Sequence, residues 1–150
     1  MENIRAGILT LLTGTTGIGV IWDHRRILDD PENFDSVFVS GGKVNCWQFY
    51  NEPGINEIPE GMGSIETRSF DWTIEGWYEF TDNATLASSS EYAFDALVEA
   101  VCTKFRDQYR VGGATNEAEI ITNIRKEITK QGSVRCHHVI MILSVAKTGL

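Results

Sequence analysis

The chain has 150 residues, with 13 basic and 21 acidic side chains, a formal net charge of −8 and a pI near 4.8. This length suffices for one domain whose core needs neither disulfides nor a metal. The acidic balance argues against a surface built to neutralise phosphates, so specific nucleic-acid binding is not expected.

The cysteines and the N-terminus indicate a cytoplasmic origin. Cys46, Cys102 and Cys136 are odd in number and far apart in the sequence, which predicts buried free thiols in a reducing compartment. Residues 1–5 lack the organisation of a signal peptide. No apolar run approaches the ~18 residues of a membrane helix. We therefore expect synthesis in the cytoplasm and no membrane contact.

The first element predicted is a short amphipathic helix over residues 2–12, ending at Gly14. The glycine-rich residues 13–19 follow it, but their G-x-x-G-x-G order fits neither the dinucleotide fingerprint nor the P-loop. The next residues, 20–22, are typical of a strand, whereas a phosphate site needs the start of a helix there. The glycines are therefore predicted to form a turn.

Two strands and a long connection are predicted next. A β-hairpin is indicated by the apolar run 37–39, the turn residues Gly41 and Gly42, and the aromatic-rich segment 44–50. Residues 51–67 then form a long loop rich in proline and glycine. Loops of this length in compact domains are usually functional or disordered. Its apolar side chains, which are candidates for contact with another subunit, are Ile55, Ile58 and Met62.

The strongest pattern is a strand followed by a helix. Residues 68–80 alternate between apolar and polar side chains, which predicts a β-strand with one buried face. In residues 90–109 the apolar period changes to three and four, which predicts an amphipathic helix. Ser88 and Glu91 are expected to form its capping box, and Gly112 with Gly113 to end it.

The last third of the chain contains one ambiguous segment and one clear strand. The isoleucines of residues 114–131 have the spacing of one helix face, but most of them would also lie on one face of a strand. The residue propensities do not decide between helix and strand. Residues 134–145 have apolar side chains on both parities. This pattern predicts a central strand covered on both faces of the sheet.

The densest cluster of potential metal ligands or nucleophiles is Cys136-His137-His138. Neighbouring strand residues point to opposite faces, so the two histidines are not expected to share a metal ion. One is expected in the core and the other exposed. A cysteine–histidine nucleophile would pair Cys102 or Cys136 with His24, but Cys102 lies on the apolar stripe of its helix. We expect no metal, no cofactor and no catalytic residues.

Charged and aromatic residues suggest contacts with partners instead. Asp71 and Glu75 are expected on the solvent face of their strand. The cluster Asp23-His24-Arg25-Arg26 is interpreted as a solvated turn, with His24, Arg25 and Arg26 as candidates for contact with a partner. Trp77 falls on the polar parity of its strand. An outward-facing tryptophan fits a subunit interface, and we include it among the interface candidates.

The order of these elements resembles that of the tail terminator, tail completion or neck proteins of tailed bacteriophages. The resemblance spans most of the chain and contains no catalytic motif. It is carried by the N-terminal helix, Val44-Asn45-Cys46-Trp47, Arg68-Ser69-Phe70, Ile74-Glu75-Gly76-Trp77-Tyr78, the helix from Glu91 to Val101, and the final strand from Cys136 to Leu143.

The resemblance implies an α/β (α+β) fold: one domain over residues 1–150, with a mostly antiparallel sheet flanked by the N-terminal helix and one long amphipathic helix. It implies an extended conformation for residues 120–128. It also implies a virion protein that forms a ring, usually hexameric, on the head-proximal end of the tail tube. The ring's partners would be further copies of the chain, the tail tube protein and the head-side connector, with genomic DNA passing through the lumen. The alternatives are a head-closure or adaptor protein of the same neck and, in another class, a small cysteine- or histidine-dependent enzyme.

Overall fold

A computed structural model describes residues 2–26, 37–51, 58–60, 67–81, 89–108, 110–112, 114–131 and 133–148. The first helix, α1 (Glu2–Thr13), ends in the glycine-rich turn that leads to β1 (Val20–Trp22). The predicted helix and turn are both confirmed. In α1 the fully buried side chains are Ile4, Ile8 and Leu12, at the spacing that places them on one face.

The predicted hairpin is also present. β2 (Val39–Ser40) and β3 (Lys43–Tyr50) pair antiparallel, and the two glycines between them, Gly41 and Gly42, have φ angles of 63° and 79°. Positive φ at both central residues is the requirement of a type I′ turn, which explains why glycine occupies both positions.

The long strand and the long helix form where the sequence predicts them, with different ends. β5 (Thr67–Glu79) is followed by α3 (Ser90–Arg106). The helix cap is Ser89, whose hydroxyl accepts from the backbone N–H of Glu91, so the predicted capping box of Ser88 and Glu91 is wrong. The helix also ends before the predicted stop, at Asp107, and Gly112 instead has a positive φ of 58° beside β6 (Arg110–Val111).

The ambiguous segment is a strand, as the resemblance implies. β7 (Ala114–Gln131) and β8 (Val134–Thr148) form a long hairpin. The predicted loop 51–67 contains a further short strand, β4 (Ile58–Glu60), which pairs with the start of β5. The prolines of that segment do not forbid this pairing, because Pro59 lies on an edge strand.

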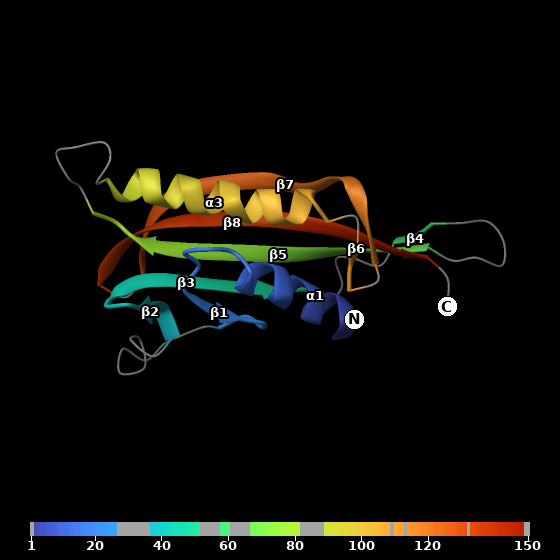
Figure 1. The fold of residues 1–150 in the computed structure, drawn as a ribbon, viewed down its shortest axis with the longest axis horizontal. Coiled ribbons are helices and arrows are strands. Elements are labelled where there is room, and N and C mark those ends of the chain that lie inside the picture. Colours follow the sequence, from blue (N-terminus) through green and yellow to red (C-terminus); the bar gives the residue numbers. More distant parts are fainter. Residues whose placement is uncertain are drawn as a thin grey trace.

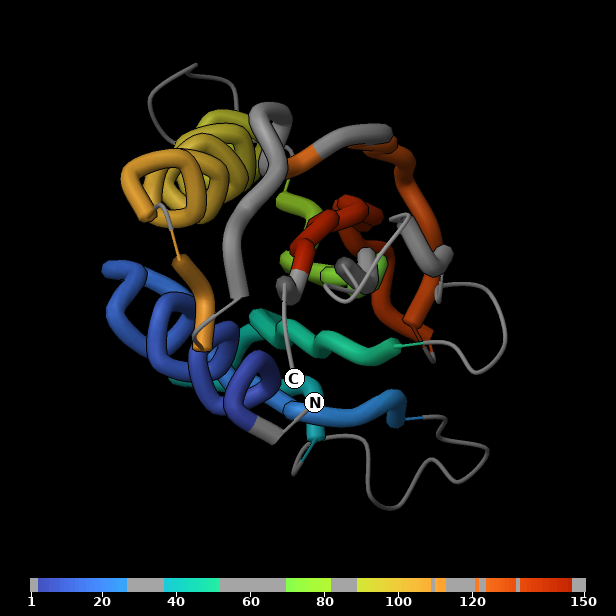
Figure 2. The backbone as a smooth tube through the Cα atoms, turned by 90° about the vertical axis from the view of Figure 1, so that its right-hand side faces the viewer, coloured from blue at the N-terminus to red at the C-terminus, as the bar shows by residue number. Residues whose placement is uncertain are grey.

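These strands form one sheet in the order β1-β3-β5-β8-β7-β6, with β2 added to β3 and β4 added to β5. All pairs are antiparallel except β1 with β3. Figure 1 shows β5 and β8 running along the molecule, and Figure 2 shows α1 and α3 on the same side of the sheet. The predicted α+β fold, with a mostly antiparallel sheet and two flanking helices in one domain, is confirmed.

The main core lies between the sheet and the two helices. Fully buried side chains of β3, β5 and β8 meet those of α1 and α3; the largest are Trp47, Phe49, Trp72, Ile74, Phe94, Phe105, Met141 and Leu143. On the opposite face, Ile140 and Ile142 of β8 are only partly buried. The central position of β8 is therefore as predicted, but its second face is less covered than the sequence suggested.

A smaller core cluster covers one end of that opposite face. It consists of Val37, Phe38, Val44, Cys46, Trp77 and Cys136. Phe38 contacts the Trp77 ring edge to face, with centroids 5.9 Å apart. Val37 and Phe38, just before β2, therefore lie over the end of β3 and β5 and enclose side chains that would otherwise face solvent.

Candidate functional site

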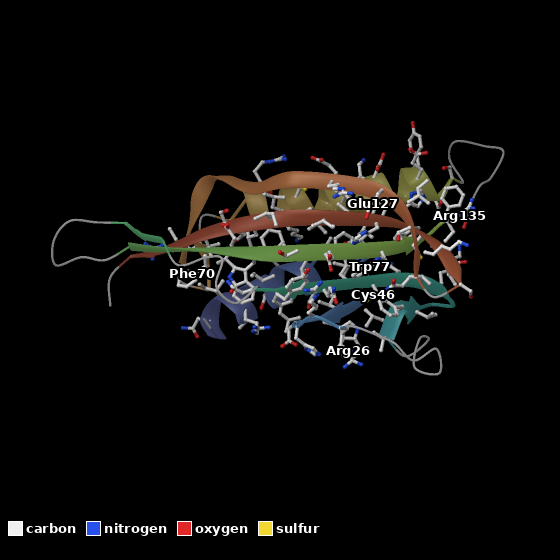
Figure 3. All side chains as sticks on the ribbon, turned by 180° about the vertical axis from the view of Figure 1, so that it is seen from behind. Arg26, Cys46, Phe70, Trp77, Glu127 and Arg135 are labelled. Carbon is white, nitrogen blue, oxygen red and sulfur yellow. The ribbon has the colours of Figure 1, made fainter. Side chains whose placement is uncertain are left out.

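Trp77 is a buried core residue, so the prediction that it faces outward is wrong for this chain. Its side chain is 7% exposed and stacks on His138, with ring centroids 4.9 Å apart. Figure 3 shows it beside Cys46, its register partner on β3. Strand alternation predicts the correct face for Trp77, but no pattern in the sequence indicates that residues 37 and 38 cover that face.

The cluster after β1 remains at the surface. His24 and Arg25 are exposed, and the hydrogen bond between the His24 ring and the Asp23 carboxylate, 2.8 Å long, lowers the pKa of Asp23. The guanidinium of Arg25 lies 5.0 Å from the Tyr50 ring centroid. That of Arg26 lies 4.5 Å from the Trp22 ring. These cation–π contacts hold basic groups over aromatic faces at one edge of the sheet.

The apolar candidates of residues 51–67 are not placed by side-chain contacts. Ile55 and Met62 lie outside the described residues. Ile58 begins β4 and pairs with Ser69 through the backbone, but its side chain is not described. Their proposed role in subunit contact stays a prediction.

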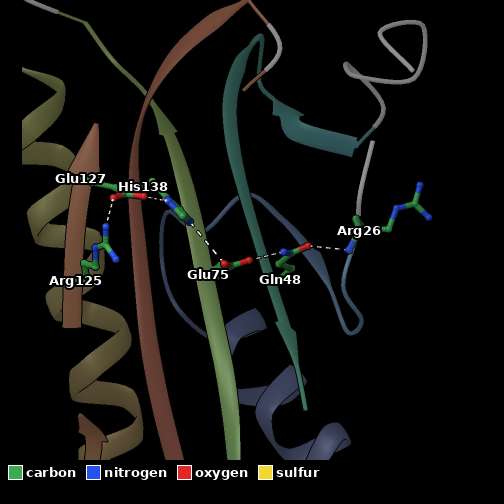
Figure 4. Close-up of polar contacts among 6 residues, drawn as sticks. All are labelled: Arg26, Gln48, Glu75, Arg125, Glu127 and His138. Carbon is green, nitrogen blue, oxygen red and sulfur yellow. Dashed lines mark hydrogen bonds and ion pairs between the residues drawn. The ribbon is translucent and has the colours of Figure 1, made fainter. Parts of the chain in front are cut away.

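A row of polar side chains crosses the face of the sheet opposite the helices (Figure 4). The backbone N–H of Arg26 donates to Gln48 Oε1 at 2.8 Å, and Gln48 Nε2 donates to Glu75 at 2.5 Å. Glu75 Oε1 lies 3.8 Å from Nε2 of His138. The row thus joins the turn after β1 to β3, β5 and β8.

The row continues to β7. His138 Nδ1 lies 3.1 Å from Glu127 Oε1, and Glu127 Oε2 lies 3.0 Å from the guanidinium of Arg125. The hydrogen bond with His138, followed by the charge of Arg125, lowers the pKa of Glu127. Because paired or hydrogen-bonded groups can be buried without a large penalty, the row explains how polar residues occupy the middle of this face.

Two predictions about exposure are wrong here. Glu75 was expected on the solvent face but is buried, because Gln48 and His138 flank it in the row. Of the two histidines one was expected to be exposed, yet both His137 and His138 are buried. They do face opposite sides of the sheet, as strand geometry predicts.

His137 faces α3, where it forms a hydrogen-bonded group with Ser90. Ser90 Oγ donates to the carbonyl of Thr81 at 2.9 Å and accepts the N–H of Thr81 at 2.7 Å. Nε2 of His137 lies 2.9 Å from the same oxygen. When the hydroxyl proton is directed to Thr81, Nε2–H of His137 is the donor to Ser90. The pair therefore fixes the start of α3 and is not arranged as a nucleophile with its general base.

The pocket beside His137 is small and of mixed character. It has a volume of about 190 Å³ and is lined by Phe80, Glu91, Phe94, Asp95, Lys126, Glu127, Ile128 and His137. Lys126 and Asp95 form an ion pair across it, 2.7 Å long. Within the described part of the chain, no three histidine, cysteine or acidic side chains gather as metal ligands.

The three cysteines are free and buried, as predicted. Burial raises the pKa of Cys46 to about 12 and that of Cys136 to about 11. Burial, followed by the charge of Glu99, also raises the pKa of Cys102. Because the thiolate is the nucleophilic form, these thiols are suited to packing rather than to catalysis.

Comparison with known proteins identifies no relative: no family model matches the chain, and no curated protein matches it. Among the helices that the structure describes, none combines the length and apolarity needed to cross a membrane.

Proposed function

We propose that this chain is a structural subunit of the neck of a tailed bacteriophage, forming a hexameric ring that caps the head-proximal end of the tail tube. The observation that carries the proposal is the order of elements together with the fold. An N-terminal helix and one long helix lie on a mostly antiparallel sheet, as the resemblance to tail terminator proteins implies.

A second support is the elongated shape of the sheet. At one end β4 pairs with residues 67–69 of β5, which pair with residues 146–148 of β8. We call this three-stranded end the arm. Figure 1 shows it beyond both helices. A subunit that joins neighbours around a ring needs such surfaces outside its own core.

The His24, Arg25 and Arg26 turn is the surface we assign to a partner protein. It presents basic groups on a chain whose formal net charge is −8. Local charge opposite to that of the whole chain gives orientation to an encounter with an acidic surface. The partners in this proposal are the tail tube protein and the head-side connector, with DNA passing through the lumen.

The experiment that tests the proposal is light scattering with negative-stain imaging of the purified chain, followed by mixing with tail tubes. Ring-shaped particles that bind tube ends and limit tube length would support a terminator. Rings that bind a connector but no tube would indicate an adaptor of the neck. Particles of one or two chains that form no ring, alone or with tubes, would contradict the proposal.

A further inference from the structure

β7 has a long outer edge without a neighbouring strand in the described part of the chain. Its inner edge pairs with β8 between Thr115 and Gln131, with two irregularities. On the outer edge, β6 pairs only with Ala114 and Thr115. In an antiparallel sheet every second residue turns its N–H and C=O away from its partner strand. The outer edge of β7 therefore presents a row of backbone groups to which another strand can bind.

Of the three exposed large apolar side chains that the structure describes, two lie on β7. Tyr92, Ile124 and Ile128 are 61%, 47% and 60% exposed, and they are the large hydrophobic residues most exposed among those described. Ile124 and Ile128 share a parity with Lys126, which reaches Asp95 of α3. Ile128, which pairs with His137 of β8, therefore lies on the helix side of the sheet, and Ile124 lies within the irregularity between Thr122 and Arg125. Apolar side chains beside an open backbone edge are characteristic of an interaction surface.

The sequence of this edge is complementary to itself. Residues 124–128 read Ile-Arg-Lys-Glu-Ile. If two copies pair antiparallel about Lys126, Ile124 lies opposite the second copy's Ile128, and Arg125 lies opposite the second copy's Glu127. Each pair occurs twice. Apolar pairs and opposite charges directly across two strands are the pairs that stabilise a sheet.

We infer that the outer edge of β7 binds the same edge of a second copy of this chain, in the register centred on Lys126. Lys126 then faces its own counterpart, but each ammonium already contacts Asp95 of its own chain at 2.7 Å. Ile128 also lines the pocket of about 190 Å³ beside His137. The second copy's Ile124, opposite Ile128, is thereby placed at the rim of this pocket.

This contact is separate from the ring of the proposed function. A two-fold contact uses the same patch on both copies and closes at two chains, whereas a ring needs a head-to-tail contact through two different patches. The β7 contact therefore joins two free subunits, or two rings, and its failure leaves the ring proposal standing. A dimer that forms no ring would support the β7 contact and contradict the ring.

The first test compares particle masses by light scattering. We expect the wild type to contain an even number of 16.8 kDa chains. I124K/I128K places lysine opposite lysine and should halve that mass, while I124K/I128E places lysine opposite glutamate and should restore it. Circular dichroism checks that both variants fold. A wild-type mass of one chain, or a mass that I124K/I128K leaves unchanged, would overturn the inference.

The second test fixes the register by a disulfide. Lys126→Cys places two thiols directly across the two-fold axis, at about 4.5–5.5 Å between Cα atoms, which is within reach of a disulfide. The matched control, Lys130→Cys, places its thiols eight residues apart along the strands, about 26 Å. We expect a covalent dimer on oxidation of the first variant and none for the second. Equal cross-linking of both variants, or of neither, would reject this register.

Discussion

At the scale of single residues, the neighbours His137 and His138 show how strand geometry separates two adjacent side chains. His137 packs under α3, stacked on Phe94 with centroids 5.4 Å apart. His138 lies on the other face between Trp77 and Glu127. One imidazole thus fixes a helix to the sheet, and the other belongs to a polar row that crosses the opposite face.

The burial of His137 predicts a pH dependence of stability. Desolvation lowers its pKa below the ordinary value of 6.5, although Glu91 and Asp95 act in the opposite direction. The folded chain therefore binds this proton less readily than the unfolded chain, and stability is lost as the pH falls below 6.5. Urea unfolding between about pH 7.5 and pH 5 measures this loss. His137→Gln keeps a donor for Ser90 and should flatten that part of the profile. An unchanged slope would show that other groups dominate it.

The buried thiols predict slow chemical modification. The pKa of Cys46 is raised to about 12 and that of Cys136 to about 11, so hardly any thiolate exists at pH 8. We expect a disulfide reagent to label the native chain slowly, and three thiols to react at once in denaturant. Fast labelling of Cys46 or Cys136 in the native chain would indicate frequent opening of the cluster that contains Val37 and Phe38.

At the scale of elements, strong periodicity was sufficient to predict type and order. The alternation in β5 and the three-and-four spacing in α3 reflect burial of one face, which the sequence encodes directly. Residues 120–128 could not be assigned in this way, because their isoleucines fit both periods. Pairing with β8 decides in favour of strand, and the three positions Ile121, Ile124 and Ile128 then differ in burial: Ile121 packs on the core and the other two are exposed.

The errors in the predicted site have a single cause, which is coverage by distant segments. Trp77 and Glu75 have the parity of a solvent face, and they do lie on the face opposite the helices. Phe38 covers Trp77, and Gln48 donates a hydrogen bond to Glu75. Periodicity reports which face a side chain occupies, but not which segment far along the chain lies over that face.

Gly76 provides a test of packing between two strands. It lies opposite Trp47 on β3, and a Cβ at this position would meet three atoms of the indole at 2.8 Å. Gly76→Ala should lower the free energy of unfolding by about 1–3 kcal/mol through overpacking. The double variant with Trp47→Phe should show a smaller penalty for the alanine, because the smaller ring leaves space. Additive effects in urea unfolding would contradict this explanation.

At the scale of the whole molecule, the two faces of the sheet differ in what they can do. Both helices cover one face and bury the main core there, while the other face is covered by residues 37–40 at one end and crossed by the polar row. The surfaces that we assign to partners are the turn after β1, the outer edge of β7 and the arm. They lie at different edges of the sheet, so one subunit can contact several neighbours.

The arm allows stability and assembly to be separated. Figure 1 shows β4 beyond the ends of both helices, and in the sheet β4 pairs with β5 alone. Replacing residues 52–66 with a short glycine–serine linker removes β4 but leaves β5 paired with β3 and β8. Because the main core is retained, we expect the variant's thermal midpoint to lie within about 4 °C of the wild type, a change of less than about 1 kcal/mol.

If the arm contacts a neighbouring subunit, the same variant should form no rings in negative stain, while the β7 contact, at a different edge, still pairs two chains. Rings of normal diameter from the shortened chain would show that the ring closes through other surfaces.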